Sequence, residues 1–145
     1  MREMSLHEIR SFLTTGTRTG KVAVVRRDGS PMVVPVWFGL DGDGTIVFTT
    51  YEKTVKAQAI SREPRVSFCV DEEAPPYAYV CIDGRAELID DTKLVRSWAT
   101  RLGGRYMGIA RAQEFGDRNA VPGEILVRIK PERIVAHADI TGLSV

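Results

Sequence analysis

The chain has 145 residues, enough for a domain with a sizeable core. Hydrophobic residues make up 43% and charged residues 27%, and the formal net charge of +1 leaves no basic surplus that would point to nucleic acid as the main partner. No apolar run approaches the roughly 20 residues that span a bilayer, and the N-terminus lacks the apolar region and cleavage site of a signal peptide, so we expect a cytoplasmic protein.

The first part of the chain predicts a helix and then two paired strands. Ser5–Glu8 has the form of a capping box, and apolar residues follow at helical spacing, which predicts a helix over residues 5–14. Lys21–Arg27 reads as a strand, and Asp28-Gly29 after it is a strong signal for a tight hairpin turn. We therefore expect this strand to pair with the apolar strand Pro31–Phe38.

The stretch from residue 30 to residue 56 organises the rest of the chain. After the strand Pro31–Phe38 it has a turn, Asp41–Gly44, and a second strand rich in β-branched residues, Thr45–Thr50. We expect these two strands to pair with each other. A helical pattern then begins and runs to about Arg62, stopping before Pro64.

Two features of this stretch are unusual for a purely structural hairpin. Pro35 lies within the apolar strand, although proline cannot donate to a β-ladder and belongs at an edge or a bulge. Lys53 and Lys56 lie near a helix N-terminus, an end that already carries partial positive charge. A bound anion would remove that conflict, and an apolar slot beside an anion site suits a flat ring with a phosphate tail. Alternatively, the lysines are solvated and Pro35 marks an edge strand.

The second half of the chain predicts further strands and helices around the same sheet. In chain order we first expect a strand Arg65–Val70 and a strand Tyr77–Ile89 with a bulge at Asp83-Gly84. A helix from Asp90-Asp91 to Gly103-Gly104 should follow, and then a short helix and loop over Arg105–Gly123. The last two expected strands are Glu124–Lys130 and Arg133–Ala138, separated by a turn at Pro131-Glu132. The tail 140–145 is expected to be loose unless it docks. This order favours a mainly antiparallel β-barrel with flanking helices, as one domain over residues 1–145, and argues against a doubly wound parallel sheet.

The sequence offers little side-chain chemistry of its own. It has no nucleophile elbow, Walker loop, zinc-protease motif or dinucleotide fingerprint, and its two histidines, His7 and His137, exclude His-rich metal sites and most catalytic triads. Cys69 and Cys81 lack CxxC spacing and a neighbouring histidine, so we expect buried free thiols and no metal site. An enzyme with this sequence would leave the hard chemistry to a cofactor.

Several short motifs, taken in order, resemble a known family. They are Asp28-Gly29, Pro35-Val36-Trp37-Phe38, Asp43-Gly44, Phe48-Thr49-Thr50, the helix-starting Lys56, Pro64-Arg65-Val66 and Asp83-Gly84-Arg85-Ala86-Glu87-Leu88. Together they resemble the split β-barrel flavoproteins related to pyridoxamine 5'-phosphate oxidase, and they are most similar to the short branch that uses FMN or the deazaflavin coenzyme F-420. The resemblance covers about residues 15–90, and residues 125–138 more loosely.

This resemblance implies a homodimer with cofactor sites at the subunit interface. It implies that the strand holding Val34, Pro35, Val36 and Trp37 lies along the isoalloxazine or deazaflavin ring, and that Thr49, Thr50, Lys53, Thr54 and Lys56 belong to the segment that holds the phosphate and ribityl tail. Lys56 is expected to act as a point charge on the phosphate. Tyr77 and Tyr79 either help to line the pocket from the partner chain or belong to the barrel wall.

Two departures from the family pattern narrow the expected function. The basic substrate motif with His and Arg that ends the oxidases proper is missing from Arg133–Ala138, so vitamin B6 oxidation is not expected. Lys53–Lys56 stands where the oxidases have an adjacent Arg-Lys pair, which fits the deazaflavin branch better. We therefore expect an F-420-dependent reductase that passes a hydride to a conjugated small molecule.

Other functions stay open at this level. The same fold would serve an FMN-dependent oxidase or reductase, or a non-catalytic carrier of a flavin or tetrapyrrole, whereas a dimerising barrel without cofactor would leave Lys53 and Lys56 unexplained. No catalytic side chain can be assigned from the sequence. Arg105, Arg111 and Arg118 either reach an acidic coenzyme tail or lie solvated on a polar face.

Overall fold

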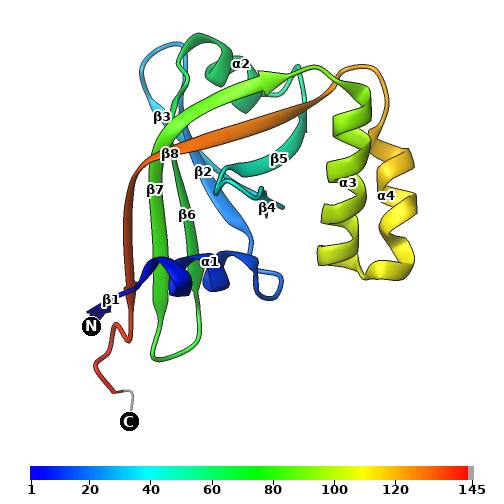
Figure 1. Ribbon diagram of the computed structural model, residues 1–145. Helices are drawn as coiled ribbons and strands as arrows, with labels where there is room; N and C mark the ends of the chain where they lie inside the picture. Colours follow the sequence, from blue (N-terminus) through cyan, green and yellow to red (C-terminus); the bar gives the residue numbers. More distant parts are fainter. Residues whose placement is uncertain (144–145) are drawn as a thin grey trace.

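One curled antiparallel sheet forms the centre of the computed structural model, which describes residues 1–143 (Figure 1). Its strands are β1 (Arg2–Glu3), β2 (Gly20–Val25), β3 (Pro31–Val36), β4 (Gly39–Leu40), β5 (Ile46–Tyr51), β6 (Arg65–Glu72), β7 (Ala78–Ile89) and β8 (Glu124–Ala138). The helices are α1 (Leu6–Thr14), α2 (Val55–Arg62), α3 (Thr92–Met107), a 3₁₀ turn (Ile109–Arg111) and α4 (Ala112–Asn119). The strand order is β3-β2-β6-β7-β8-β5-β4, with β1 paired to β8.

A bulge bends the two longest strands and lets the sheet curl. Asp83 of β7 pairs with Arg133 of β8, but the next residue, Gly84, pairs with Pro131, so that Glu132 is an extra residue on β8. Both strands change direction sharply in Figure 1. The predicted bulge at Asp83-Gly84 is therefore confirmed. The predicted turn at Pro131-Glu132 is wrong, because β8 continues through this point as a single strand.

Strand β3 lies at one edge of the sheet. Among residues 1–143 it pairs with β2 alone, in a hairpin that joins Gly20 to Val36 and Val25 to Pro31. The predicted pairing of this strand with Thr45–Thr50 is wrong, because β5 pairs instead with β8, from a distant part of the chain, and with the short β4. The edge position explains how a strand tolerates Pro35, which has no N–H to donate.

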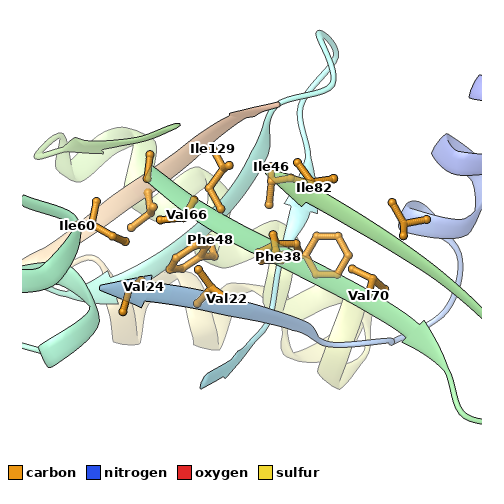
Figure 2. Close-up of a cluster of buried hydrophobic side chains, with 14 of the residues drawn as sticks. Val22, Val24, Phe38, Ile46, Phe48, Ile60, Val66, Val70, Ile82 and Ile129 are labelled. Carbon is orange, nitrogen blue, oxygen red and sulfur yellow. The ribbon is translucent and has the colours of Figure 1, made fainter. Parts of the chain in front are cut away.

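The inner face of the curled sheet holds the main core (Figure 2). Val22, Phe48 and Ile129 are fully buried there, and the rings of Phe38 and Phe68 meet edge to face with centroids 5.1 Å apart. Burying a side chain of this size contributes about 1.5–3 kcal/mol to folding, so the barrel wall itself is the principal source of stability. Helix α1, which has the predicted capping box at Ser5, adds Leu13 to this core.

A hairpin of two helices, α3 and α4, packs beside β5 and β8 and forms a second, smaller core (Figure 1). The predicted end of the first helix at Gly103-Gly104 is wrong, since α3 runs on to Met107. A Cβ on Gly103 would lie 2.5 Å from the Cβ of Phe115, so this glycine serves close packing of the two helices. Within residues 1–143, none of the helices combines the length and the apolar character that crossing a membrane requires.

The two cysteines face each other across β6 and β7. Cys69 pairs directly with Cys81 in the register, and both thiols are free and half-buried. Burial, reinforced by a hydrogen bond with the Cys81 thiol, raises the pKa of Cys69 to about 12. The expectation of free thiols is confirmed, although their burial is only partial.

Candidate functional site

A cavity of about 230 Å³, here called the slot, lies between the sheet, the first turn of α2 and the α3–α4 hairpin. Its lining residues are Val36, Trp37, Thr49, Lys56, Ala99, Leu102 and Asn119. Four of these were predicted as cofactor-binding residues, and they come from three separate elements. Most of the lining is apolar, with a hydroxyl, an ammonium and a carboxamide as its polar groups. Mainly apolar walls with a few convergent polar groups are typical of small-molecule sites.

The aromatic wall of the slot is Trp37, which follows the last residue of β3. Its ring stacks on Tyr106 of α3, with centroids 5.2 Å apart and an interplanar angle of 4°. Phe115 of α4 meets the same ring edge to face at 5.4 Å. Because Trp37 is held on two sides by rings, it presents a fixed, flat apolar surface.

Arg105 and Tyr106 anchor the backbone next to this wall. Arg105 donates to the carbonyl oxygens of Phe38 at 2.7 Å, Leu13 at 2.9 Å and Gly16 at 3.0 Å. The Tyr106 hydroxyl donates to the Arg18 carbonyl at 2.8 Å and accepts from the N–H of Phe38 at 3.2 Å. These bonds tie the end of α3 to the α1–β2 connection and fix the position of the Trp37-Phe38 segment.

The arginines of residues 103–123 therefore do not form an open cationic cluster. Arg105 is directed at backbone carbonyls, which excludes the alternative that it reaches a coenzyme tail in this conformation. Arg111 is ion-paired with Glu114 at 2.8 Å, and Arg118 lies 5.7 Å from the centroid of the Phe115 ring. The structure assigns the first of these arginines to the fold and leaves the other two on the outer surface of the hairpin.

Lys56 is the polar group of the slot with the most unusual surroundings. Its side chain is half-buried, and burial lowers its pKa, while the carboxylate of Glu124 raises it again in part. Among residues 1–143, Lys56 has no hydrogen-bond or ion-pair partner. A half-buried cation without a hydrogen-bonded counter-charge is unfavourable unless a ligand supplies one. Lys53 is exposed and does not line the slot.

The threonines near Lys56 divide into two groups. Thr49 lines the slot, and its hydroxyl has no partner within the described residues. Thr50 is 6% exposed and its hydroxyl lies 3.2 Å from that of Thr54, which in turn caps α2 by accepting from the N–H of Ala57 at 3.3 Å. Thr50 and Thr54 thus shape the turn that presents Lys56.

The strand residues expected along a ring also divide. Val36 and Trp37 line the slot. Val34 lies on the same face of β3 as Val36 and also packs against the core, but it does not line the slot, and Pro35 is exposed on the other face. Since successive side chains of a strand point to opposite faces, these four residues cannot all present side chains to one ring. The free edge of β3 can still border a ligand through its backbone.

Sequence reasoning missed three residues of the slot, namely Ala99, Leu102 and Asn119. They belong to the helical hairpin, whose second helix was expected only as a short helix and loop. Leu102 follows the helical apolar pattern of α3, which marked it as buried but not as ligand-facing, and Ala99, also buried, was not singled out. Asn119 carries no motif, and the spacing of the sequence gives no signal for it.

The curled barrel, its bulged central strands and its helix-covered slot together define a split β-barrel of the flavin-binding class. The model of the pyridoxamine 5'-phosphate oxidase family matches residues 5–138, and the chain belongs to that family. Members of this family bind flavins and include oxidoreductases.

Solved structures agree with this assignment. A conserved hypothetical protein from Mycobacterium tuberculosis superposes with a TM-score of 0.84 at 27% identity, over 97% of this chain and 89% of the other. A FAD-binding protein from Mesorhizobium loti has a TM-score of 0.67 at 26% identity, over 93% and 95% of the two chains. A protein described as an F-420 reductase has a TM-score of 0.67 at 24% identity, over 86% and 94%, which supports the fold alone. No curated protein sequence matched the chain.

Proposed function

We propose that the protein is an F-420-dependent reductase that transfers a hydride from the reduced deazaflavin to a conjugated small molecule. The observation that carries this proposal is the half-buried Lys56, which lies without a hydrogen-bond partner among residues 1–143, in a cavity with one flat aromatic wall. An anionic group next to a planar ring is what such a cavity would accept. F-420 and FMN both have this character.

The residues present fit the phosphate end of such a coenzyme. Lys56 would place its ammonium on a phosphate oxygen and Thr49 would add its hydroxyl, while Val36 and Trp37 exclude water from one side. The slot, at about 230 Å³, is smaller than the roughly 300–1,000 Å³ of common ligand pockets, so it holds only part of the coenzyme. The rest would lie along the free edge of β3, beside Val34 and Pro35.

The bound coenzyme supplies the hydride, and the protein supplies position and a dry environment. Of the slot residues, Lys56 is the only one with a titratable side chain, so no general acid or base other than Lys56 lines it within residues 1–143. The two histidines lie elsewhere, with His137 hydrogen-bonded to Tyr79 at 3.0 Å. We therefore expect the rate to depend on holding the substrate against the ring.

We also propose that two copies of the chain assemble with the cofactor between them. Three apolar side chains on the elements that carry slot residues are exposed: Val33 of β3 is 66% exposed, Val55 of α2 54% and Tyr51 of β5 42%. A second copy would cover them and close the open side of the ring site. Light scattering of the purified protein tests this point, with Val33→Asp as the variant expected to favour the monomer and Ile109→Asp, at an 85% exposed site on the helical hairpin, as its control.

Two other functions have a specific observation in their favour. An FMN-dependent oxidase or reductase would use the same Lys56 and Thr49, because FMN also ends in a phosphate. A non-catalytic carrier would be consistent with the few titratable groups in the slot. The three functions make different predictions about cofactor choice and turnover.

Titration of the apo-protein with F-420 and FMN in parallel, followed by fluorescence quenching, separates the cofactors. We expect tight binding of F-420 and weaker binding of FMN. Reduced F-420 bound to the protein should then be oxidised only when a conjugated carbonyl compound such as a quinone is added. Preference for FMN would replace F-420 in the proposal, and binding without substrate-dependent oxidation across a screen of such acceptors would favour the carrier.

A further inference from the structure

Three polar side chains from three different elements line the slot without a hydrogen-bond partner within residues 1–143. They are Thr49 of β5, Lys56 of α2 and Asn119, the last residue of α4. None of the three side chains forms a hydrogen bond or an ion pair within residues 1–143. The first two belong to the proposed phosphate anchor, but Asn119 comes from the helical hairpin. It is also the only asparagine of the chain.

The hairpin holds Asn119 in a defined place. Phe115 packs on Gly103, and Gly116 packs so closely on Thr100 that a Cβ there would lie 2.0 Å from the threonine hydroxyl oxygen. The last turn of α4 is closed by the N–H of Ala120, which donates to the carbonyl of Gly116 at 3.1 Å. Because α4 packs closely on α3 at both Phe115 and Gly116, a rigid element presents the Asn119 carboxamide to the slot.

A carboxylate lies near the Lys56 ammonium, although the two groups form no ion pair within residues 1–143. Lys56 contributes one positive charge, and Glu124 at the start of β8 lies close by, because the N–H of Glu52 donates to the carbonyl of Gly123 at 2.8 Å and joins the two turns. Burial raises the pKa of Glu124, and the positive charge of the nearby Lys56 offsets part of this rise. Such a site offers one cation and two neutral groups, and the nearby carboxylate disfavours excess negative charge.

We infer that Asn119 is a further ligand-binding residue, whose carboxamide N–H donates to a phosphate oxygen. Thr49, Lys56 and Asn119 together form a phosphate-binding site, here called the cradle. This cradle prefers a singly charged phosphodiester to a doubly charged monoester. The inference rests on the proposed function and deepens it. F-420 carries a phosphodiester, whereas FMN carries a monoester, so the cradle gives a physical reason for the cofactor preference. A carboxamide can donate two hydrogen bonds without adding charge.

Asn119→Asp tests the donor role with the smallest change in shape. It replaces the N–H₂ group by a charged acceptor, and it should weaken F-420 binding at least tenfold. Gln113→Glu is the matched control, because it makes the same chemical change on the outer face of the same helix, where Gln113 donates to Asp117 at 3.2 Å. The control should change the affinity less than twofold, and circular dichroism should show that both variants are folded. Equal affinities of the wild type and Asn119→Asp would overturn the inference.

A second measurement tests phosphate binding at Asn119 independently of coenzyme binding. The chain has one asparagine and two glutamines, so its ¹⁵N spectrum contains only three side-chain amide pairs, and the Asn119 pair is the one that Asn119→Asp removes. Titration with dimethyl phosphate should shift that pair in the wild type and leave it unmoved in Lys56→Met, and inorganic phosphate at the same concentration should shift it less.

The two measurements together distinguish the possible failures. Movement of the Asn119 pair with dimethyl phosphate, without binding of F-420 or FMN, would support the cradle and overturn the proposed coenzyme function. Tight F-420 binding that leaves the Asn119 pair unmoved would support the coenzyme and overturn the role of Asn119. A larger response to inorganic phosphate than to the diester would overturn the charge preference.

Discussion

Arg105 and Lys56 are both half-buried cations whose pKa is lowered chiefly by burial, yet their surroundings are opposite. The guanidinium of Arg105 donates to three backbone carbonyls and joins three parts of the chain. Lys56 faces a cavity and has no hydrogen-bond partner in the described residues. The first arrangement is complete without a ligand, whereas the second is completed by one. Partner geometry, rather than burial or pKa alone, therefore separates a structural cation from a ligand-binding one.

The largest expected effect is on the structural side of this comparison. Arg105→Met removes the donor of the Leu13 and Gly16 carbonyls and leaves the Phe38 carbonyl with only the Tyr106 hydroxyl at 3.3 Å. Hydrogen bonds to charged groups contribute about 1.5–3 kcal/mol each, so we expect the free energy of unfolding to fall by about 3 kcal/mol after partial replacement by water. Urea denaturation measures this loss. Arg101→Met is the control, since Arg101 is exposed and only covers the Trp98 ring on the same helix. Similar losses in the two variants would mean that the three carbonyl bonds contribute little.

Lys56→Met should weaken coenzyme binding without lowering the free energy of unfolding, the reverse of the effect expected for Arg105→Met. Losing a charge-assisted hydrogen bond should weaken F-420 binding by about 1–3 kcal/mol, roughly 5- to 150-fold. The free energy of unfolding should stay the same or rise, because the variant removes a desolvated charge. Titration and urea denaturation of the same preparation check both halves. A destabilised protein with unchanged affinity would assign Lys56 to the fold and remove the distinction from Arg105.

Alkaline pH should weaken binding through Lys56 before it affects Arg105. Burial places the pKa of Lys56 below its usual 10.5, so the ammonium needed by the phosphate is lost as the pH rises toward that value. For stability the sign is opposite, because the unfolded state binds the proton more tightly, and this group favours folding more as the pH rises through the same range. F-420 affinity should therefore fall in the wild type as the pH rises toward 10.5, and it should fall less in Lys56→Arg. Parallel curves for both proteins would show that another group controls binding.

The smallest expected effect concerns Lys53, the other lysine of the predicted anchor. Its side chain is exposed and outside the slot, so solvent screens its interaction with a bound anion. Lys53→Met should reduce F-420 affinity less than about threefold at physiological salt, with the difference disappearing at high salt. A loss as large as that of Lys56→Met would extend the site beyond the slot and blur the contrast between buried and exposed cations.

Local patterns in the sequence predicted the elements that local forces determine. The capping box of α1, the Asp28-Gly29 turn and the end of α2 before Pro64 all follow from residues a few positions apart. The partner of β5 could not be predicted in this way, because its ladder with Ile125–Ile129 joins residues about eighty positions apart in the chain. Gly103 was read as a helix end for a similar reason, since its role depends on a contact with Phe115 from the next helix.

The residues of the candidate site also differ in whether the sequence could predict them. Trp37, Thr49 and Lys56 lie in one stretch of the chain. The conflict between a cation and a helix N-terminus singled out Lys56, whereas Trp37 and Thr49 were implied by the resemblance to the family. Asn119 and Tyr106 could not be predicted, because the hairpin that carries them reaches the slot only through tertiary packing. The predicted roles of Val34, Pro35, Thr50, Lys53 and Thr54 as cofactor ligands stay predictions, and the structure places all five outside the slot lining.

A crystal structure of the protein with F-420 bound would test the central claim most directly. We predict a phosphate oxygen within about 2.7–3.2 Å of the Lys56 ammonium, with the Thr49 hydroxyl beside it and the deazaflavin ring along the free edge of β3. A coenzyme phosphate bound elsewhere, with Lys56 still lacking a partner, would contradict the claim that this half-buried cation is the anchor of the site.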